Sequence, residues 1–332
     1  MVRDQPAYYQ DLMSLTEMDA TCSLSNLRSI DFRLMRNGHE TPISRLVDPS
    51  DMLTLERVYS EYRNGSTLVL MFLHERIPAL WALCRTLSQE FSAAFQVNAY
   101  LTPRNARGLS VHYDTHDVFV LQIHGEKQWR LYGAAEILPV PGLPYRREEL
   151  SSRTATEEVT LRAGDLLYIP RGVVHEASSK DRTSLHLTVG VLSITWGEVI
   201  MSAVESVIKQ DWRLRESLPI GFSSNEALAR DAERRLAELV ELVKGKISVP
   251  DIIKGEARRA ELFCKPDLRR HLLDLDFEPA ISLRSLLWRR RDLQWKIQIE
   301  EDECRLVFHG KELRCQAIWL KQYNSLQTRK GQ

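Results

Sequence analysis

Short apolar runs separated by turn residues fill the middle third of the chain, from Gln96 to Leu192, and they constrain the fold more than any other feature. The runs are QVNAYLT, DVFVLQI, KQWRLYG, EEVTLRAGDLLYIP and SLHLTVGVLSI. Turn residues separate them at His124–Gly125, Ala163–Asp165 and Pro170–Gly172. Short strands at such close spacing predict a β-barrel or jelly roll of about 100 residues.

The regions on either side of these runs have a helical pattern. Helices are predicted around residues 5–30, 50–63 and 78–95, with a hairpin signal at Asn37–Gly38 between the first two. Beyond Trp196 the pattern is helical again, and one charged helix carries an apolar stripe formed by Leu236, Leu239, Val240 and Val243.

The last 70 residues have a pattern of their own. A basic helix LRSLLWRRRDL precedes the alternating run LQWKIQIE and the hairpin-like CRLVFHGKELRC, which is the outline of a winged helix. We therefore expect four parts: an N-terminal α/β segment over 1–95, the barrel core over 96–195, a helical segment over 196–262 and a winged-helix-like domain over 263–332.

Composition narrows the class of protein. The 332 residues can bury a sizeable core, and Lys plus Arg equal Asp plus Glu at 45 each, so the whole-chain charge gives no argument for a nucleic-acid partner. The five cysteines are odd in number and form no C-x-x-C pair, which argues against a disulfide framework. No apolar run approaches the roughly 18 residues of a membrane span. We expect a cytoplasmic protein with no membrane partner.

Polar residues capable of chemistry crowd into one stretch of the predicted barrel, GLSVHYDTHDVFVLQIHGEKQWRLYG. In a strand, residues i and i+2 point to the same face, so His112 and Asp114 project together with Cα atoms about 6.6 Å apart. His116 shares that face but would lie roughly 13 Å from His112, too far for one ion. A surface strand that merely carries a histidine and an aspartate is the alternative interpretation.

A third metal ligand would have to come from another strand. An H-x-D pair followed far downstream by a histidine in an all-β module is the layout of the two-histidine, one-carboxylate triad that binds non-heme Fe(II). His175 and His186 both fit this layout, and the pattern alone does not choose between them.

Four motifs together, NAYLTP, HYDTHDVFVLQIHGEKQWRLY, AGDLLYIPRGVVHEA and SLHLTVG, resemble the cupin-type JmjC ribosomal oxygenases. The resemblance covers residues 96–192 in motif content, order and spacing, and extends more loosely over the helical and winged-helix-like parts. It implies a double-stranded β-helix core and a homodimer formed through the helical segment.

The resemblance also implies roles for single residues. His112 and Asp114 become the first two iron ligands and His175 the third, and no catalytic group is expected beyond this metal site. His186 is then expected to point into the barrel beside the ligands.

For the cosubstrate, Lys127 matches the basic residue that binds the distal carboxylate of 2-oxoglutarate. A buried dicarboxylate needs a cation at its far end. Asn98, Tyr100 and Ser184 match positions that line the cosubstrate and substrate pocket.

The implied function is a dioxygenase that uses Fe(II), 2-oxoglutarate and O2 to hydroxylate an arginine or histidine side chain of a ribosomal protein. Members of the family usually carry a further segment before the part that corresponds to AYYQDLMSLTEMD, and this sequence begins almost at that point, so part of the substrate-facing wall is expected to be missing or built differently. The alternatives are the same chemistry on another peptide, such as a natural-product precursor, and a non-catalytic metal-binding cupin. Arg289–Arg291 suggest nucleic-acid contact, but the short wing and neutral chain argue against sequence-specific binding.

Overall fold

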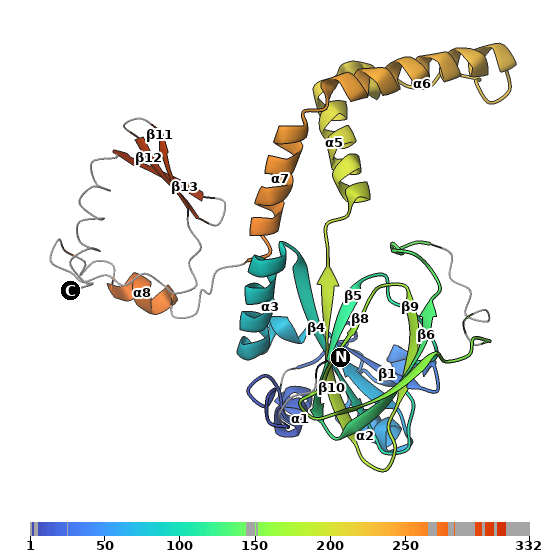
Figure 1. Ribbon diagram of the computed structural model, residues 1–332, viewed down its shortest axis with the longest axis vertical. Coiled ribbons are helices and arrows are strands. Elements are labelled where there is room, and N and C mark those ends of the chain that lie inside the picture. The colour runs from blue at the N-terminus through green and yellow to red at the C-terminus, as the bar shows by residue number, and fades with distance from the viewer. Residues whose placement is uncertain are drawn as a thin grey trace. The chain divides into compact units, whose positions relative to one another are not determined.

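The structure is a computed structural model that describes residues 2, 6–24, 26–143, 150, 152–264, 271–277, 282, 296–300, 303–308 and 311–316 (Figure 1). The chain divides into two compact units, Met1–Ser193 and Ile194–Gln332. The first unit contains the predicted barrel, and the second contains a group of helices and a separate small sheet.

Two antiparallel sheets form the framework of the first unit. The larger has seven strands in the order β2-β1-β3-β4-β10-β5-β8, and the smaller has three in the order β7-β6-β9. The strands are β1 (Phe32–Arg36), β2 (His39–Glu40), β3 (Thr67–Leu70), β4 (Ala94–Thr102), β5 (Asp117–His124), β6 (Glu126–Ala134), β7 (Glu157–Arg162), β8 (Leu166–Ile169), β9 (Val173–Ser178) and β10 (Ser184–Leu192). This arrangement confirms the predicted jelly-roll core of a mainly β fold with helices.

The two faces of the large sheet have different surroundings. One face packs against the helices α1 (Leu15–Leu24), α2 (Leu55–Arg63) and α3 (Pro78–Phe91), and the other faces the small sheet across a second apolar cluster. Side chains alternate along each strand. Leu185 and Leu187 of β10 therefore enter the helix-covered core, while His186 and Thr188 enter the space between the sheets.

The structure differs from the sequence prediction in the presence of β9 and in the position at which the first helix begins. The run VVHEAS was not predicted as a strand, because its central His175 and Glu176 break the apolar pattern although both are buried. Glu176 is accommodated by Arg107 Nη1 at 2.9 Å and by the hydroxyl of Tyr132 at 2.6 Å. The first helix begins only after Ser14, whose Oγ accepts a hydrogen bond from the Glu17 amide.

The second unit contains four described helices and three strands. These are α5 (Trp196–Gln210), α6 (Glu226–Lys246), α7 (Val249–Glu261), α8 (His271–Phe277), β11 (Lys296–Glu300), β12 (Glu303–Phe308) and β13 (Lys311–Gln316). The strands pair as an antiparallel sheet in sequence order, so the predicted hairpin CRLVFHGKELRC supplies β12 and β13. The predicted basic helix, with Arg289–Arg291, and the His309–Gly310 turn lie outside the described residues. Within the described part of the chain, no helix combines the length and apolarity that crossing a membrane requires.

Candidate metal and cosubstrate site

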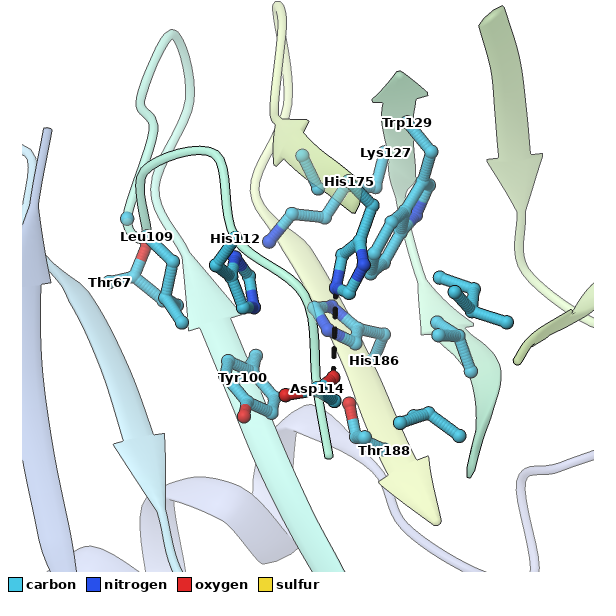
Figure 2. A pocket seen from close by; sticks show the side chains of 15 residues that line it. Thr67, Tyr100, Leu109, His112, Asp114, Lys127, Trp129, His175, His186 and Thr188 are labelled. Carbon is cyan, nitrogen blue, oxygen red and sulfur yellow. Dashed lines mark ion pairs between the residues drawn. The ribbon is translucent and has the colours of Figure 1, made fainter. Parts of the chain in front are cut away.

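Three potential metal ligands lie together between the two sheets. One ligand atom from each of His112, Asp114 and His175 lies within 4.8 Å of the others, and the Nε2 atom of His175 is 3.7 Å from Asp114 Oδ2 (Figure 2). Their geometry suits the facial arrangement of two histidines and one carboxylate around a divalent transition metal.

Backbone hydrogen bonds hold this cluster together. The His112 amide donates to the His175 carbonyl at 3.1 Å, and the His175 amide donates to the His112 carbonyl at 2.8 Å. The Gly172 amide donates to the Asp114 carbonyl at 3.0 Å. Between residues 108 and 116, only His112 is in a β-bridge. This segment is therefore a loop joined to β9 at one residue, and not the extended strand that the sequence predicts.

Hydrogen bonds also fix the tautomer of both imidazoles. Nδ1 of His112 lies 2.8 Å from the Ser110 carbonyl, and Nδ1 of His175 lies 2.9 Å from the Val173 carbonyl. A carbonyl oxygen can only accept, so each Nδ1 carries the proton. Each Nε2 therefore has a free lone pair, as metal ligation requires.

Electrostatics keep the third ligand neutral. Burial, together with the neighbouring His112, lowers the pKa of His175 to about 4, although the Asp114 carboxylate acts in the opposite direction. Neutral imidazole is the form that binds a metal ion. The donor set therefore fits Fe(II) at neutral pH.

A cavity leads from this cluster to Lys127 on β6 (Figure 2). Lys127 is only 4% exposed, and its Nζ donates to Thr102 Oγ1 at 2.7 Å. Burial lowers the pKa of Lys127 to about 7. Within the described part of the chain no carboxylate pairs with this ammonium, so the cavity ends at a cation suited to an incoming carboxylate.

The second histidine left open by the sequence pattern lines the same cavity but does not join the metal cluster. The His186 ring stacks on Tyr100 with 4.8 Å between ring centroids, and it makes a T-shaped contact with Trp129 with 5.4 Å between centroids. Burial, with a contribution from Lys127, lowers the pKa of His186 well below its usual value. His186 therefore forms part of the cavity wall as a neutral ring.

The predicted cosubstrate residues divide into two groups. Lys127 and Tyr100 line the cavity, whereas Asn98 and Ser184 do not. Asn98 Oδ1 accepts from the Phe72 amide at 3.0 Å, and the Asn98 side chain also hydrogen-bonds with Tyr100. Ser184 Oγ accepts from Gln122 Nε2 at 2.9 Å. These two residues therefore share the strand faces of Tyr100 and His186 but lie outside the cavity lining.

Sequence reasoning missed two threonines beside Lys127. Thr102 continues the alternation of Asn98 and Tyr100 along β4, so the two-residue period could have found it. Thr67 is on β3, about 60 residues earlier than Lys127, and no local pattern connects it with the site. The structure also leaves His116 outside the metal cluster, with its ring close to the backbone of Gly190.

The fold and this cluster define a class: a jelly-roll protein with two histidines and one carboxylate grouped between its sheets. Residues 70–199 match the family model described as the JmjC domain. Together with the relatives described next, this match confirms the predicted resemblance to the JmjC ribosomal oxygenases.

Two curated relatives illustrate the similarity. "Bifunctional lysine-specific demethylase and histidyl-hydroxylase NO66" of Dictyostelium discoideum is 41% identical over 176 residues, which cover 50% of this chain and 34% of that protein. "Ribosomal oxygenase 1" of Gallus gallus is 28% identical over 344 residues, which cover 94% of this chain and 55% of that protein. The chain thus spans between a third and just over half the length of these relatives.

Among solved structures, Escherichia coli YcfD, described as a ribosomal oxygenase in complex with cobalt and 2-oxoglutarate, has a TM-score of 0.47 and 15% identity. The match covers 93% of this chain and 78% of that chain.

Proposed function

We propose that this chain is an Fe(II)- and 2-oxoglutarate-dependent oxygenase that hydroxylates a histidine or arginine side chain of a ribosomal protein. The observation that carries this proposal is a single cavity with a two-histidine, one-carboxylate cluster at one end and the buried, carboxylate-free Lys127 at the other. A chelating dicarboxylate is the kind of molecule whose charge pattern complements both ends.

In this proposal, His112 and His175 would hold Fe(II) through Nε2, and Asp114 would hold it through its carboxylate. When bound with 2-oxoglutarate and O2, the iron supplies the oxidation that inserts one oxygen atom into a substrate C–H bond and yields succinate and CO2. The protein's own task is to fix ligand geometry, to orient the cosubstrate and to exclude water.

Each group in the cavity has a part in that task. The Lys127 ammonium would pair with the distal carboxylate of 2-oxoglutarate. The stacked rings of Tyr100 and His186 and the indole of Trp129, which is nearly perpendicular to them, form an aromatic wall along the cavity. The apolar side chains of Val118 and Val120 add to the lining and limit the access of water.

Names of relatives support the substrate class. One relative is named a histidyl-hydroxylase and another a ribosomal oxygenase, so histidine in a ribosomal protein is the first candidate and arginine the second. Both are polar side chains that project from a protein surface and could enter the cavity toward the iron.

We also propose that the second unit makes the protein a homodimer. None of the residues of α6 is buried, and its apolar stripe includes Leu236 at 63% and Val240 at 55% exposure. Trp196 and Ile200 on α5 are likewise exposed. A two-fold pairing would cover such self-complementary apolar faces.

The test is a two-part assay on the full chain loaded with Fe(II). Succinate release from 2-oxoglutarate would be measured with a ribosomal protein extract present, and the extract would then be searched by mass spectrometry for peptides that gained one oxygen. His175→Ala is the matched control. Iron binding without succinate or oxygen gain would refute the oxygenase and favour a non-catalytic cupin, and oxygen gain on a non-ribosomal peptide would overturn the substrate class.

A further inference from the structure

Two buried hydroxyls lie next to the ammonium at the end of the cavity. Thr67 Oγ1 donates to Thr102 Oγ1 at 3.0 Å, and Lys127 Nζ donates to the same Thr102 oxygen at 2.7 Å. Thr67 is 1% exposed and Thr102 is 0% exposed. The three residues are on β3, β4 and β6, so the hydrogen bonds connect both sheets through one oxygen atom.

The bonding pattern fixes the direction of the ammonium. The hydroxyl oxygen of Thr102 offers two lone pairs, and the two donors occupy both. Lys127 uses one of its three N–H bonds on a neutral oxygen, which holds the nitrogen in place but leaves its charge uncompensated. The other two N–H bonds remain for a ligand in the cavity that Lys127 lines.

The loop before His112 packs closely against Thr67. A Cβ atom added to Gly108 would lie 2.5 Å from Thr67 Oγ1, so only glycine lets the loop approach the hydroxyl so closely. The Asn37 amide donates to the Arg107 carbonyl, and the Gly38 amide donates to the Gly108 carbonyl. The β1–β2 turn thereby holds the loop against Thr67.

We propose that Thr67 and Thr102 are positioning residues that aim the Lys127 ammonium at the distal carboxylate of 2-oxoglutarate. This inference rests on the proposed function. Thr67 lies before the first residue of the JmjC match at residue 70, so a residue outside the matched range would contribute to the cosubstrate subsite. A valine at either position would preserve the volume but remove the hydroxyl, which separates the positioning role from simple packing.

The test measures ligand binding without turnover. Full-length protein loaded with Mn(II) would be titrated calorimetrically, without O2, with 2-oxoglutarate and with 2-oxopentanoate, which has the same chain length but no distal carboxylate. We expect Thr102→Val to weaken 2-oxoglutarate binding about tenfold, because it removes a hydrogen bond to a charged group. Thr67→Val, one bond further away, should weaken it about threefold. Neither change should affect 2-oxopentanoate.

Two controls separate this role from a general structural one. Thr102→Ser and Thr67→Ser keep the hydroxyl and should restore 2-oxoglutarate affinity to within about twofold. In a Lys127→Met background, Thr102→Val should have no further effect, because the threonine acts through the lysine. Thermal melting of each variant checks the fold, and Thr67→Val serves as the second probe where Thr102→Val does not fold.

Each outcome decides a specific point. Unchanged 2-oxoglutarate affinity in a folded Val variant, or equal weakening of both keto acids, would overturn the positioning role. A wild-type protein that binds Mn(II) but neither keto acid would instead refute the proposed function.

Discussion

His112 and His175 are partners in an isolated antiparallel β-bridge, joined by two reciprocal backbone hydrogen bonds of 3.1 and 2.8 Å, with 4.4 Å between their ring centroids. The backbone thus sets the separation of the two imidazoles before any metal binds. Because each Nδ1 is also engaged by a carbonyl two residues earlier in the chain, each ring is fixed in both position and tautomer. A site prepared in this way needs little rearrangement to accept an ion.

Removal of any one ligand should abolish stoichiometric iron binding. We expect His112→Ala, Asp114→Ala and His175→Ala each to lose bound Fe(II) after desalting, because two ligands cannot replace the triad. Metal content per chain is the measurement. His124→Ala, at the exposed end of β5, is the control that should keep full occupancy.

His186→Ala discriminates between the two histidines that the sequence pattern left open. It should retain iron, since His186 lies in the cavity wall and outside the cluster. Retained iron in His175→Ala together with lost iron in His186→Ala would contradict the assignment.

The affinity for 2-oxoglutarate should fall as pH rises above about 7. Burial lowers the pKa of Lys127 from 10.5 to about 7, so above that pH the unliganded lysine is neutral and must take up a proton to pair with a carboxylate. Each further pH unit should then weaken binding by up to about tenfold. Below pH 7 the lysine is already charged, and affinity should level off.

Calorimetric titration of the Mn(II)-loaded protein between pH 6 and 9 is the measurement. Lys127→Arg provides the control, because a guanidinium stays charged throughout and its affinity should not follow this pH dependence. His175, whose pKa is about 4, stays neutral over the whole range and adds no slope. A pH-independent affinity in the wild-type protein would show that Lys127 does not contact the ligand.

The proposed dimer should dissociate when charge is placed on α6. Leu236→Asp combined with Val240→Asp introduces two carboxylates, one helical turn apart, on the exposed apolar stripe. Light scattering should give twice the chain mass for the wild type and a single chain mass for the variant, with iron content unchanged. Glu233→Ala, an exposed polar change on the same helix, should remain dimeric. A wild-type protein that is monomeric at tens of micromolar would refute the proposal.

Two glycines with similar positive φ angles should differ in their tolerance of a side chain. Gly125 and Gly133 have φ angles of +66° and +73°, but a Cβ at Gly125 would lie 2.0 Å from the Thr183 carbonyl, whereas one at Gly133 would meet nothing within 4 Å. Gly133→Ala should cost about 1 kcal/mol from backbone strain alone. Gly125→Ala should cost roughly 2 kcal/mol more, because atoms overlap. Urea denaturation of both variants gives the comparison, and equal losses would contradict it.

The alternating strands β4, β5, β6, β7, β8 and β10 were predictable from local patterns because each buries an apolar face with a two-residue period. The H-x-D pair was predictable for a similar reason, since both residues lie within one short segment. β9 was missed because Glu176 is buried through Arg107 and Tyr132, which are distant in sequence. A strand whose polar groups are paired by remote partners carries no local apolar signal.

The sequence by itself therefore determined the jelly-roll class, the turns and the identity of the candidate ligands, because these depend on residue type and short-range spacing. Only the tertiary structure decided which downstream histidine meets Asp114, that Asn98 and Ser184 lie outside the cavity lining, and that Thr102 joins Thr67 to Lys127. These relationships join residues up to about 60 positions apart through strand pairing. Strand register fixes such neighbours, and register is set by the packing of the whole sheet rather than by any single segment.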